Sequence, residues 1–302
     1  MKILITGANG FLGHYLTAAL LNRNLQVTAT GKGPCRLPYT GQPGFTYSEM
    51  DFTQPEEVQE VMKAVEPDVV VHCGAISKPD ECEKDQWAAY QANVEATITL
   101  LEEAETFRSF FIFLSTDFIF PGDRGMYIET DTPGPVNFYG KTKLEAEKAV
   151  IEYGYPWAIV RTVLVYGPSL TGRGNLITVV KEKLEKGETY SVFDDQVRTP
   201  TYVTDLANGI VSIIEKKATG IFHLSGEDVR TPYEMACATA RLLGYDEKLI
   251  KRVIAGEFVQ TAKRPAKTGF DISKAKKILG FNPVSFEKGL ALTFPDAVKN
   301  KS

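Results

Sequence analysis

Short apolar runs alternate along the first half of the chain with longer segments whose apolar residues recur every three to four positions. The runs are rich in β-branched residues and apolar at successive positions, which is typical of strands buried on both faces of a sheet. The alternation predicts a doubly wound α/β domain over roughly the first 165 residues, with a parallel sheet covered by helices on both faces. The predicted strands are, in order, 2–6, 26–30, a short third strand that ends at 51, 68–74, 110–116 and 157–167, and the predicted helices between them are 11–24, 55–65 and 87–104.

The pattern becomes less regular after the segment VYGPSLTGRGN, where proline and glycines interrupt it. We expect a smaller, mixed α/β domain to begin there. The segment 202–217 has the pattern of an amphipathic helix, and the last helices are expected at 270–281 and 285–294. The predicted boundaries are 1–167 for the first domain, with 198–217 packing back on it, and 168–197 together with 218–302 for the second.

The composition argues against several classes of partner. The chain has 302 residues, 43% of them hydrophobic, and a formal net charge of −4. No run of Lys or Arg is long enough to follow a nucleic acid backbone, and no apolar stretch approaches the roughly 20 residues that span a bilayer. The N-terminus enters a strand at once, which leaves no room for a signal peptide. We therefore expect a soluble, cytoplasmic protein that binds neither a nucleic acid polymer nor a membrane.

The cysteines and histidines do not predict a metal centre. The cysteines lack C-x-x-C spacing, and the three histidines do not complete a ligand set. We expect the cysteines to be packing residues without disulfides. These residues are Cys35, Cys73, Cys82, Cys237, His14, His72 and His223.

The segment ITGANGFLG joins the first predicted strand to the first predicted helix, with Gly7, Gly10 and Gly13 in G-x-x-G-x-x-G spacing. Small residues are needed where the chain turns sharply and where the backbone approaches a pyrophosphate. The helix N-terminus that follows offers free N–H groups and a partial positive charge. Such glycines can also serve tight turns alone, but the strand–turn–helix context predicts a dinucleotide-binding site.

The end of the second predicted strand indicates which dinucleotide binds. A carboxylate there would accept from the ribose 2′-hydroxyl of NAD and repel the 2′-phosphate of NADP. The segment VTATGKG presents Thr30 and Lys32 and no acid, so NADP(H) is favoured, with NAD(H) as the alternative. Asp51 ends the third strand, where it could accept from the adenine amino group or cap the next helix. Gly74 and Ala75 follow the fourth strand and are small enough for a cofactor to approach closely.

Tyr139 precedes Lys143 by four positions at the start of a predicted helix. Positions i and i+4 share a helical face, so the phenol and the ammonium point the same way. A nearby ammonium favours the phenolate and lowers the pKa of a tyrosine from about 10, which makes it a usable acid. The pair could instead be two unrelated side chains on a surface helix. Thr116 and Asp117 end the fifth strand, at the edge of the sheet where ligands gather, and a hydroxyl there can hydrogen-bond a carbonyl.

Together, the glycine turn, the STD segment and the Y-x-x-x-K pair resemble the extended short-chain dehydrogenase/reductase family. Four further segments are similar to motifs of its dTDP-4-dehydrorhamnose reductase branch, and the similarity spans nearly the whole chain. It implies a first domain of the Rossmann type and a second domain that binds substrate. The four segments are STDFIFPG, YGKTKLEAE, RTVLVYGPSLTGRGN and KRPAKTGFDISKAKKILGF.

The resemblance implies a role for each candidate residue. Tyr139 would protonate the substrate carbonyl as NADPH delivers hydride, Lys143 would bind the nicotinamide ribose, and Thr116 would hydrogen-bond the carbonyl. The implied cofactor-binding residues are Gly7, Gly10, Phe11, Leu12, Gly13, Thr30, Lys32, Asp51, Phe52, Cys73, Gly74, Ala75, Tyr139 and Lys143. The implied substrate-binding residues are Thr116, Asp117, Leu164, Asn175, Arg198 and Arg264.

For some of these residues, a specific contact or an alternative role can be stated. The resemblance implies that Asp117 binds a sugar hydroxyl, and that Asn175 and Arg198 contact the nucleotide diphosphate. For Arg198, and for Arg264 near the sugar cleft, a salt bridge at the surface or between domains is an equal alternative. Asn93 matches a family asparagine that holds a backbone link more often than it takes part in chemistry.

At two positions the sequence differs from the usual motifs of this branch, so the identity of the sugar that the protein binds is not determined. Leu164 stands where the branch usually carries a tryptophan along the substrate sugar, and Phe118 replaces a tyrosine and so removes one hydroxyl. The leading hypothesis is an NADPH-dependent reductase of a nucleotide-linked 4-keto-6-deoxy sugar, with the step from dTDP-4-dehydrorhamnose to dTDP-L-rhamnose first.

Two alternatives remain. A nucleotide-sugar epimerase or dehydratase shares the fold, although dehydratases commonly carry an acid pair where Asp117 is followed by Phe118, and epimerases usually carry the second-strand acid. The second alternative is a non-catalytic regulatory subunit that binds NADP. The presence of Thr116, Tyr139 and Lys143 argues against this alternative but does not exclude it. Some relatives form homodimers, and the sequence fixes neither the oligomeric state, the nucleotide nor a magnesium dependence.

Overall fold

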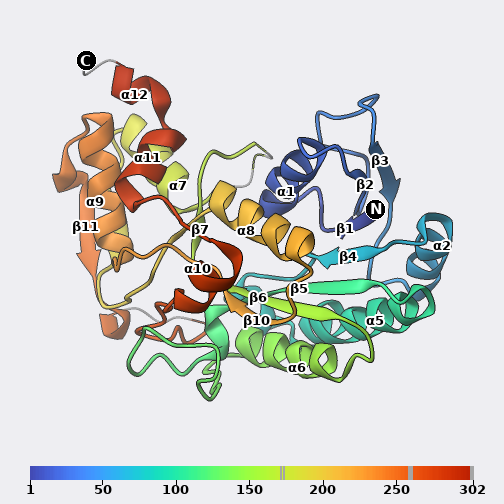
Figure 1. Ribbon diagram of the computed structural model, residues 1–302. Helices are drawn as coiled ribbons and strands as arrows, with labels where there is room; N and C mark the ends of the chain where they lie inside the picture. Colours follow the sequence, from blue (N-terminus) through green and yellow to red (C-terminus); the bar gives the residue numbers. More distant parts are fainter. Residues whose placement is uncertain (171, 173, 258–260, 300–302) are drawn as a thin grey trace.

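The computed structural model describes residues 1–302 apart from 171, 173, 258–260 and 300–302, and its centre is a seven-stranded sheet (Figure 1). The strands of this sheet are β1 (Lys2–Thr6), β2 (Gln26–Gly31), β3 (Phe45–Glu49), β4 (Val69–His72), β5 (Phe110–Thr116), β6 (Trp157–Thr162) and β10 (Gly220–His223). Neighbouring strands are parallel throughout, in the order β10-β6-β5-β4-β1-β2-β3. Because the chain moves outwards from β1 on one side and from β4 on the other, the sheet is doubly wound, and the predicted fold class is confirmed.

Helices cover both faces of the sheet (Figure 1). The helices α1 (Phe11–Leu21) and α8 (Val203–Lys216) lie on one face, and α2 (Pro55–Val65), α5 (Ala96–Phe107) and α6 (Phe138–Glu152) lie on the other. In β1, Ile3 and Ile5 are buried with residues of α1 and α8, whereas Leu4 is buried with residues of α2 and α5. Alternate side chains thus enter two different cores, which is why the strands are apolar at successive positions.

The helix predicted at 87–104 is divided in the structure. The helix α4 (Gln86–Tyr90) is followed by a π-helical turn, η1 (Gln91–Glu95), before α5 begins. Within the turn, Asn93 Oδ1 accepts from the backbone N–H of Ile76 at 2.8 Å, and Asn93 Nδ2 donates to the carbonyl of Ile76 at 3.0 Å. The backbone link expected of Asn93 is therefore present, in a helix irregularity of the kind often found near functional sites.

The strand predicted at 157–167 is also interrupted. The strand β7 (Val165–Tyr166) leaves the central sheet and pairs with β9 (Thr201–Tyr202). Leu164 has a positive φ of 31°, which is strained for a side chain of this size. The backbone N–H of Thr201 donates to the carbonyl of Leu164 at 3.2 Å, so a segment distant in the sequence holds this turn in place.

The segments predicted for the second domain build a smaller layer beside the sheet (Figure 1). The strands β8 (Tyr190–Phe193) and β11 (Ile250–Val253) pair in parallel, and α7 (Leu176–Glu185) and α9 (Pro232–Leu243) share a buried cluster with them. The remaining elements are α3 (Pro79–Lys84), α10 (Ser273–Leu279), α11 (Phe286–Thr293), α12 (Pro295–Lys299) and the 3₁₀ turns η2 (Asp117–Ile119), η3 (Glu247–Leu249) and η4 (Ala255–Glu257). The helices α10 and α11 lie where the sequence predicted the last helices.

The strand β10 is an exception to the predicted division. It falls within 218–302, the range assigned to the second domain, but pairs with β6 at the edge of the central sheet. Phe222 of β10 is buried in the same cluster as Ile210 and Ile213 of α8, so the helix and the strand that follows it enter one core together. Ala275 and Leu279 of the helix α10, also in this range, are buried in the same cluster. For the other segments, the division into two domains stays a prediction.

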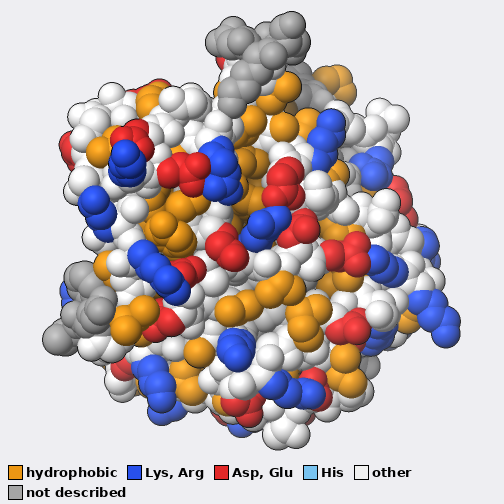
Figure 2. Space-filling model, turned by 90° about the vertical axis from the view of Figure 1, so that its left-hand side faces the viewer, with side chains coloured by type: hydrophobic (Ala, Val, Ile, Leu, Met, Phe, Trp, Pro, Cys, Tyr) orange, Lys and Arg blue, Asp and Glu red, His pale blue; other side chains and the backbone are white. Residues whose placement is uncertain are grey.

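The surface on the side of α9, α11 and α12 carries acidic and basic side chains interspersed with hydrophobic ones (Figure 2). A mixed surface of this kind lacks the single-sign field that draws a polyanion over long distances. Within the described residues, the structure contains no helix that is both long and apolar enough to span a bilayer.

Candidate active site

A cavity of about 510 Å³ opens at the carboxyl ends of β1, β4 and β5. Ligands of doubly wound sheets bind at this edge, and the cavity brings together segments from the glycine turn to the C-terminal quarter of the chain. The predicted site residues that line it are Gly7, Gly10, Phe11, Leu12, Gly13, Cys73, Ala75, Thr116, Asp117, Tyr139, Lys143, Leu164, Asn175, Arg198 and Arg264.

The turn between β1 and α1 allows a ligand to approach the backbone closely. Gly7 has a φ of +67°, and a Cβ on Gly7 would lie 2.8 Å from the Cα of Gly74. A Cβ on Gly74 would in turn lie 2.5 Å from the ring of Phe52. The helix α1 begins at Phe11 after Gly10, which provides no side-chain cap, so the first N–H groups of the helix are left for a ligand or solvent. The turn therefore fits the diphosphate of a dinucleotide.

Several residues predicted for the adenosine end lie outside this cavity. Thr30 is fully buried, and its hydroxyl donates to the carbonyl of Ile5 at 3.1 Å, so the sheet itself uses that group. Phe52 packs edge-on against His72, with ring centroids 5.5 Å apart. The predicted residues that do not line the cavity are Thr30, Lys32, Asp51, Phe52 and Gly74.

Lys32 and Asp51 form an ion pair, with Lys32 Nζ 2.8 Å from Asp51 Oδ2. Burial raises the pKa of Asp51, but the hydrogen bonds from Lys32 and Thr53 outweigh this effect and lower it. The N-cap position of α2 is occupied by Gln54, so the N-cap role considered for Asp51 is wrong. The second strand ends without an acid, as the sequence indicated, yet the fold brings one beside Lys32 from the third strand.

Thr116, Tyr139 and Lys143 line one wall of the cavity, from the end of β5 and the first turns of α6. Lys143 is 2% exposed, and its Nζ lies 3.8 Å from the centroid of the Phe113 ring. Burial lowers the pKa of Lys143 to about 7, against the attraction of nearby anionic groups, of which Glu147 is the strongest. Tyr139 is half-buried and lies in the wall of the cavity, not on an open surface helix.

The start of α6 is held by Asn137, which places Tyr139 in the first turn. Asn137 Oδ1 accepts from the backbone N–H of Gly140 at 2.8 Å, as an N-cap does. Asn137 Nδ2 donates to the carbonyl of Lys263 at 2.7 Å. The beginning of the helix is thus tied to the C-terminal segment that carries Arg264. The ring of Phe118 packs edge-on against Tyr139, with centroids 5.9 Å apart.

Glu147 and Arg161 form a buried ion pair behind the wall that carries Lys143. Their side chains are 1% and 3% exposed, and Arg161 Nη2 lies 2.6 Å from Glu147 Oε2. Ser115, the residue before Thr116, donates through Oγ to Glu147 Oε1 at 2.5 Å. The pair therefore joins α6 to the ends of β5 and β6, the elements that place the candidate catalytic side chains.

Asp117 and Arg198 face each other within the protein. Asp117 is 4% exposed, and its carboxylate accepts from the hydroxyls of Thr116 and Thr268 and lies 3.7 Å from Arg198 Nε. Burial raises the pKa of Asp117, although Arg198 and these hydroxyls oppose that shift. The structure holds both charged side chains in protein contacts, so their predicted bonds to a ligand stay predictions.

Asn175 and Arg264 also line the cavity, although they lie far apart in the second half of the sequence. Both Nη atoms of Arg264 bind the carboxylate of Asp80, at 2.7 and 2.5 Å, so the salt bridge considered for Arg264 is present. Asn175 is the N-cap of α7, and its Nδ2 donates to the carbonyl of Gly167 at 2.7 Å. Leu164 reaches the cavity from the strained turn before β7.

Sequence reasoning missed a number of lining residues. Gln196 lies two positions before Arg198 in a short polar segment, which was the available signal for it. Most of the others are apolar or small and carry no pattern that separates a cavity wall from a core. The missed residues are Ser77, Pro79, Leu114, Thr162, Val165, Gly174, Leu176, Gln196, Leu206 and Pro232.

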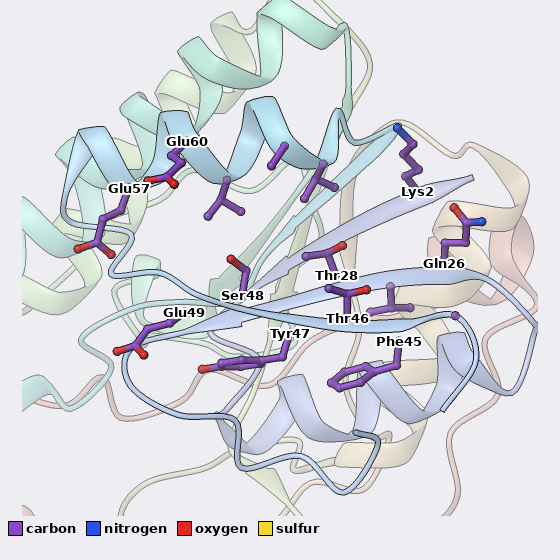
Figure 3. Close-up of a pocket in the computed structure, with 15 residues that line it drawn as sticks. Lys2, Gln26, Thr28, Phe45, Thr46, Tyr47, Ser48, Glu49, Glu57 and Glu60 are labelled. Carbon is purple, nitrogen blue, oxygen red and sulfur yellow. The ribbon is translucent and has the colours of Figure 1, made fainter. Parts of the chain in front are cut away.

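A larger hollow, of about 840 Å³, lies between α2 and the strands β2 and β3 (Figure 3). Figure 3 shows Thr28, Thr46 and Ser48 on the strands below α2, which carries Glu57 and Glu60. None of the predicted site residues, all of which lie in the described part of the chain, belongs to its lining. The smaller cavity is therefore the candidate active site.

The histidines are buried at separate places in the fold. His14 lies in α1, His72 is the last residue of β4, and His223 is the last residue of β10. His72 Nδ1 forms a hydrogen bond of 2.6 Å with the hydroxyl of Thr6. The four cysteines are free. Among the described residues, no three His, Cys, Asp or Glu side chains gather in a way that could hold a metal ion.

Comparison with known proteins places this geometry in a family. The family model described as RmlD substrate binding domain matches residues 1–298. Methionine adenosyltransferase 2 subunit beta of Rattus norvegicus is 34% identical over 283 residues, which cover 92% of this chain and 82% of the relative. A dTDP-4-dehydrorhamnose reductase structure from Clostridium acetobutylicum superposes with a TM-score of 0.86 at 29% identity and covers 99% of this chain and all of its own.

A second solved dTDP-4-dehydrorhamnose reductase, from Bacillus anthracis and in complex with NADP, gives a TM-score of 0.84 at 27% identity and covers 98% of this chain and 99% of its own. The match to the family model extends from the glycine turn through the C-terminal segment that carries Arg264, so it includes every residue of the candidate site. The chain therefore belongs to the RmlD substrate binding domain family, within the dTDP-4-dehydrorhamnose reductase-like branch of the extended short-chain dehydrogenases/reductases.

Proposed function

We propose that the protein is an NADPH-dependent reductase of a nucleotide-linked 4-keto-6-deoxy sugar, with dTDP-4-dehydrorhamnose as the first substrate to test. The observation that carries this proposal is that Thr116, Tyr139 and Lys143 line the same cavity as the glycine turn. A cavity with a phosphate-binding turn at one end and a hydroxyl, a phenol and an ammonium in its wall suits reduction of a carbonyl.

The chemistry follows from the placement of these groups. A bound nicotinamide dinucleotide supplies the hydride. Tyr139 donates its phenolic proton to the carbonyl oxygen as the carbonyl carbon is reduced, so the ketone becomes an alcohol. Thr116, whose hydroxyl donates to Asp117 Oδ1 in the free protein, turns this hydroxyl to the carbonyl and holds it by a hydrogen bond. Lys143, one helical turn from Tyr139, binds the nicotinamide ribose and stabilises the phenolate left after proton transfer, and an anionic cofactor nearby favours its charged form.

The comparisons support a reductase of this family but do not identify its substrate. Two solved relatives over nearly the whole chain are named dTDP-4-dehydrorhamnose reductase, and one was solved with NADP. In this chain Leu164 and Phe118 line the cavity where the branch usually carries a tryptophan and a tyrosine. We therefore assign the 4-keto sugar nucleotide as a class and leave the hexose to experiment.

A second candidate function is a non-catalytic NADP-binding subunit of another enzyme. The observation that favours it is the 34% identity to methionine adenosyltransferase 2 subunit beta over 92% of this chain. The presence of Thr116, Tyr139 and Lys143 in one cavity favours turnover instead. A dehydratase is less favoured because Asp117 is followed by Phe118 and not by a second acid, and an epimerase is less favoured because the second strand ends without an acid.

Turnover separates these functions. The purified protein should oxidise NADPH when given dTDP-4-dehydrorhamnose, and Tyr139→Phe should bind NADPH within about twofold of wild type while losing at least about 100-fold in turnover. Tyr153→Phe is the matched control, since Tyr153 caps the far end of α6 and its hydroxyl donates to the carbonyl of Ser109. NADPH binding without oxidation across a panel of 4-keto sugar nucleotides would favour the regulatory subunit, and equal turnover by Tyr139→Phe would reject the proposed role of the phenol.

A further inference from the structure

Gln196 carries a buried donor in the wall of the active-site cavity. The residue is 8% exposed and lines the cavity between β8 and β9. Its Oε1 accepts from Arg198 Nη2 at 3.4 Å. Because a guanidinium can only donate, the end of the amide that faces Arg198 must be the oxygen, which fixes the position of the nitrogen. That nitrogen, Gln196 Nε2, has no hydrogen-bond partner within the described part of the chain.

Arg198, the residue that the sequence assigned to the nucleotide diphosphate, is in the opposite situation. The N–H groups on Nη1 and Nη2 have four hydrogen-bond acceptors, three of them backbone carbonyls, whereas Nε faces Asp117 only at the distance of an ion pair. This leaves Nη1 and Nη2 of Arg198 without a spare donor, so that Arg198 acts mainly as a source of positive charge. The acceptors are the carbonyls of Val197, Pro265 and Ala266, Gln196 Oε1 and, at 3.7 Å, Asp117 Oδ2.

The surroundings of Gln196 suit a negatively charged group. Asn175 and Leu176 line the cavity at the N-terminus of the ten-residue helix α7, and Pro232 lines it at the N-terminus of the twelve-residue helix α9. Helix N-termini carry partial positive charge, and the Arg198 guanidinium adds a positive charge that the Asp117 carboxylate, 3.7 Å from Nε, offsets in part. This end of the cavity therefore combines positive potential with an unused hydrogen-bond donor.

We propose that Gln196 binds the diphosphate of the nucleotide sugar, donating through Nε2 to a phosphate oxygen, and that Gln196 rather than Arg198 makes the direct hydrogen bond to this group. The inference rests on the proposed function for the class of ligand. Arg198 then acts as a positioning residue, which holds the Gln196 amide through Oε1 and supplies charge. Buried polar groups that stay unpaired in the free protein are unfavourable, and a ligand acceptor removes that penalty.

The alternative is that Gln196 only supports Arg198. The two roles give opposite results for Gln196→Met, which keeps the length of the side chain and removes both donor and acceptor. If Gln196 binds ligand, the variant loses affinity for a nucleoside diphosphate. The thermal midpoint of the free protein does not decide this case, because the substitution removes the unpaired Nε2 donor and also takes an acceptor away from Arg198 Nη2. If Gln196 only supports Arg198, the thermal midpoint falls and the affinity is kept.

The experiment is isothermal titration of wild type and Gln196→Met with dTDP and, separately, with NADPH, together with thermal unfolding of each free protein. We expect at least a tenfold weaker affinity for dTDP and an NADPH affinity within twofold of wild type. Gln196→Glu is the second variant, because its carboxylate still accepts from Arg198 but offers no donor, and it should weaken dTDP binding further. Gln59→Met, at an exposed position of α2, is the control and should change neither affinity.

The outcomes separate this inference from the function on which it rests. If wild type and both Gln196 variants bind dTDP with equal affinity, the inference is overturned while the nucleotide-sugar function stands. If wild type binds NADPH but neither dTDP nor UDP, the proposed substrate class fails and the role of Gln196 fails with it. A lower thermal midpoint with unchanged dTDP affinity assigns Gln196 to support of Arg198 and also overturns the inference.

Discussion

The ammonium of Lys143 lies 3.8 Å above the ring of Phe113 in a side chain that is 2% exposed. A cation over an aromatic face gains some attraction, but removing an ammonium from water is unfavourable, and burial lowers the pKa of Lys143 to about 7. A charge that destabilises the folded chain is therefore kept in the wall of the cavity where the proposed reaction needs it.

Lys143→Met should raise the thermal midpoint of the free protein by a few degrees and lower turnover by at least about 100-fold. Methionine has a similar length and packs well against an aromatic ring, so the buried charge is removed without leaving a cavity. Lys141→Met, at an exposed position of the same helix, is the control and should change neither property. A thermal midpoint below that of wild type would show that the buried ammonium stabilises the fold.

The gain in stability from Lys143→Met should depend on pH. The pKa of Lys143 falls from its usual 10.5 to about 7 on folding, so between these values the unfolded chain binds more protons than the folded one. The free energy of unfolding of wild type therefore rises with pH relative to the variant. Urea unfolding of both proteins at pH 6.5 and pH 9.5 should show the advantage of Lys143→Met shrinking at the higher pH, and an unchanged difference would contradict the buried pKa.

Glu147→Met should destabilise the protein by about 3–5 kcal/mol, because Arg161 would remain buried without its partner. The double variant Glu147→Met/Arg161→Met should be more stable than the single variant, since no buried charge is left unpaired. Glu145→Met on the same helix removes an exposed partner of Lys148 and should cost no more than about 1 kcal/mol. Urea unfolding measures all three, and a double variant less stable than Glu147→Met would refute the explanation.

Lys32→Met should weaken NADPH binding about tenfold and change NADH binding by less than about twofold. The ammonium is 83% exposed and lies 2.8 Å from the Asp51 carboxylate, so it stands beside the end of β2 where a 2′-phosphate is expected. Lys63→Met on α2 is an exposed control. Fluorescence titration with NADPH and with NADH measures both affinities. An equal loss of affinity for the two cofactors would show that Lys32 serves only as the ion-pair partner of Asp51.

Gly7→Ala should weaken NADPH binding by at least about tenfold and lower the thermal midpoint, because the new Cβ would lie 2.8 Å from Gly74 in addition to the strain of a φ of +67°. Gly41→Ala separates the two causes. Gly41 has a φ of +84° but open space around its Cβ position, so the substitution should cost about 1 kcal/mol and leave binding unchanged. Similar behaviour of the two variants would mean that crowding at Gly74 is unimportant.

Much of the fold could be predicted from local pattern. The helix at 55–65 and the strands β1, β2, β4 and β5 have a clear helical period or continuous apolar positions, and they lie where the pattern placed them. The strand at 157–167 could not be predicted correctly, because Thr201 interrupts it at Leu164 through hydrogen bonds from a distant segment. The assignment of β10 failed for a related reason, since pairing with β6 decides its place and local pattern does not.

The candidate site divides in the same way. The sequence by itself determined which residue types stand at the ends of strands and on one face of α6, because strand and helix periods fix these relations over short distances. Only the tertiary structure decided that Asp51 meets Lys32, that Arg198 is occupied by the backbone near Pro265, and that Gln196 keeps an unpaired donor. Each of these depends on segments far apart in the chain, whose packing decides which polar group has a partner and which is left for a ligand.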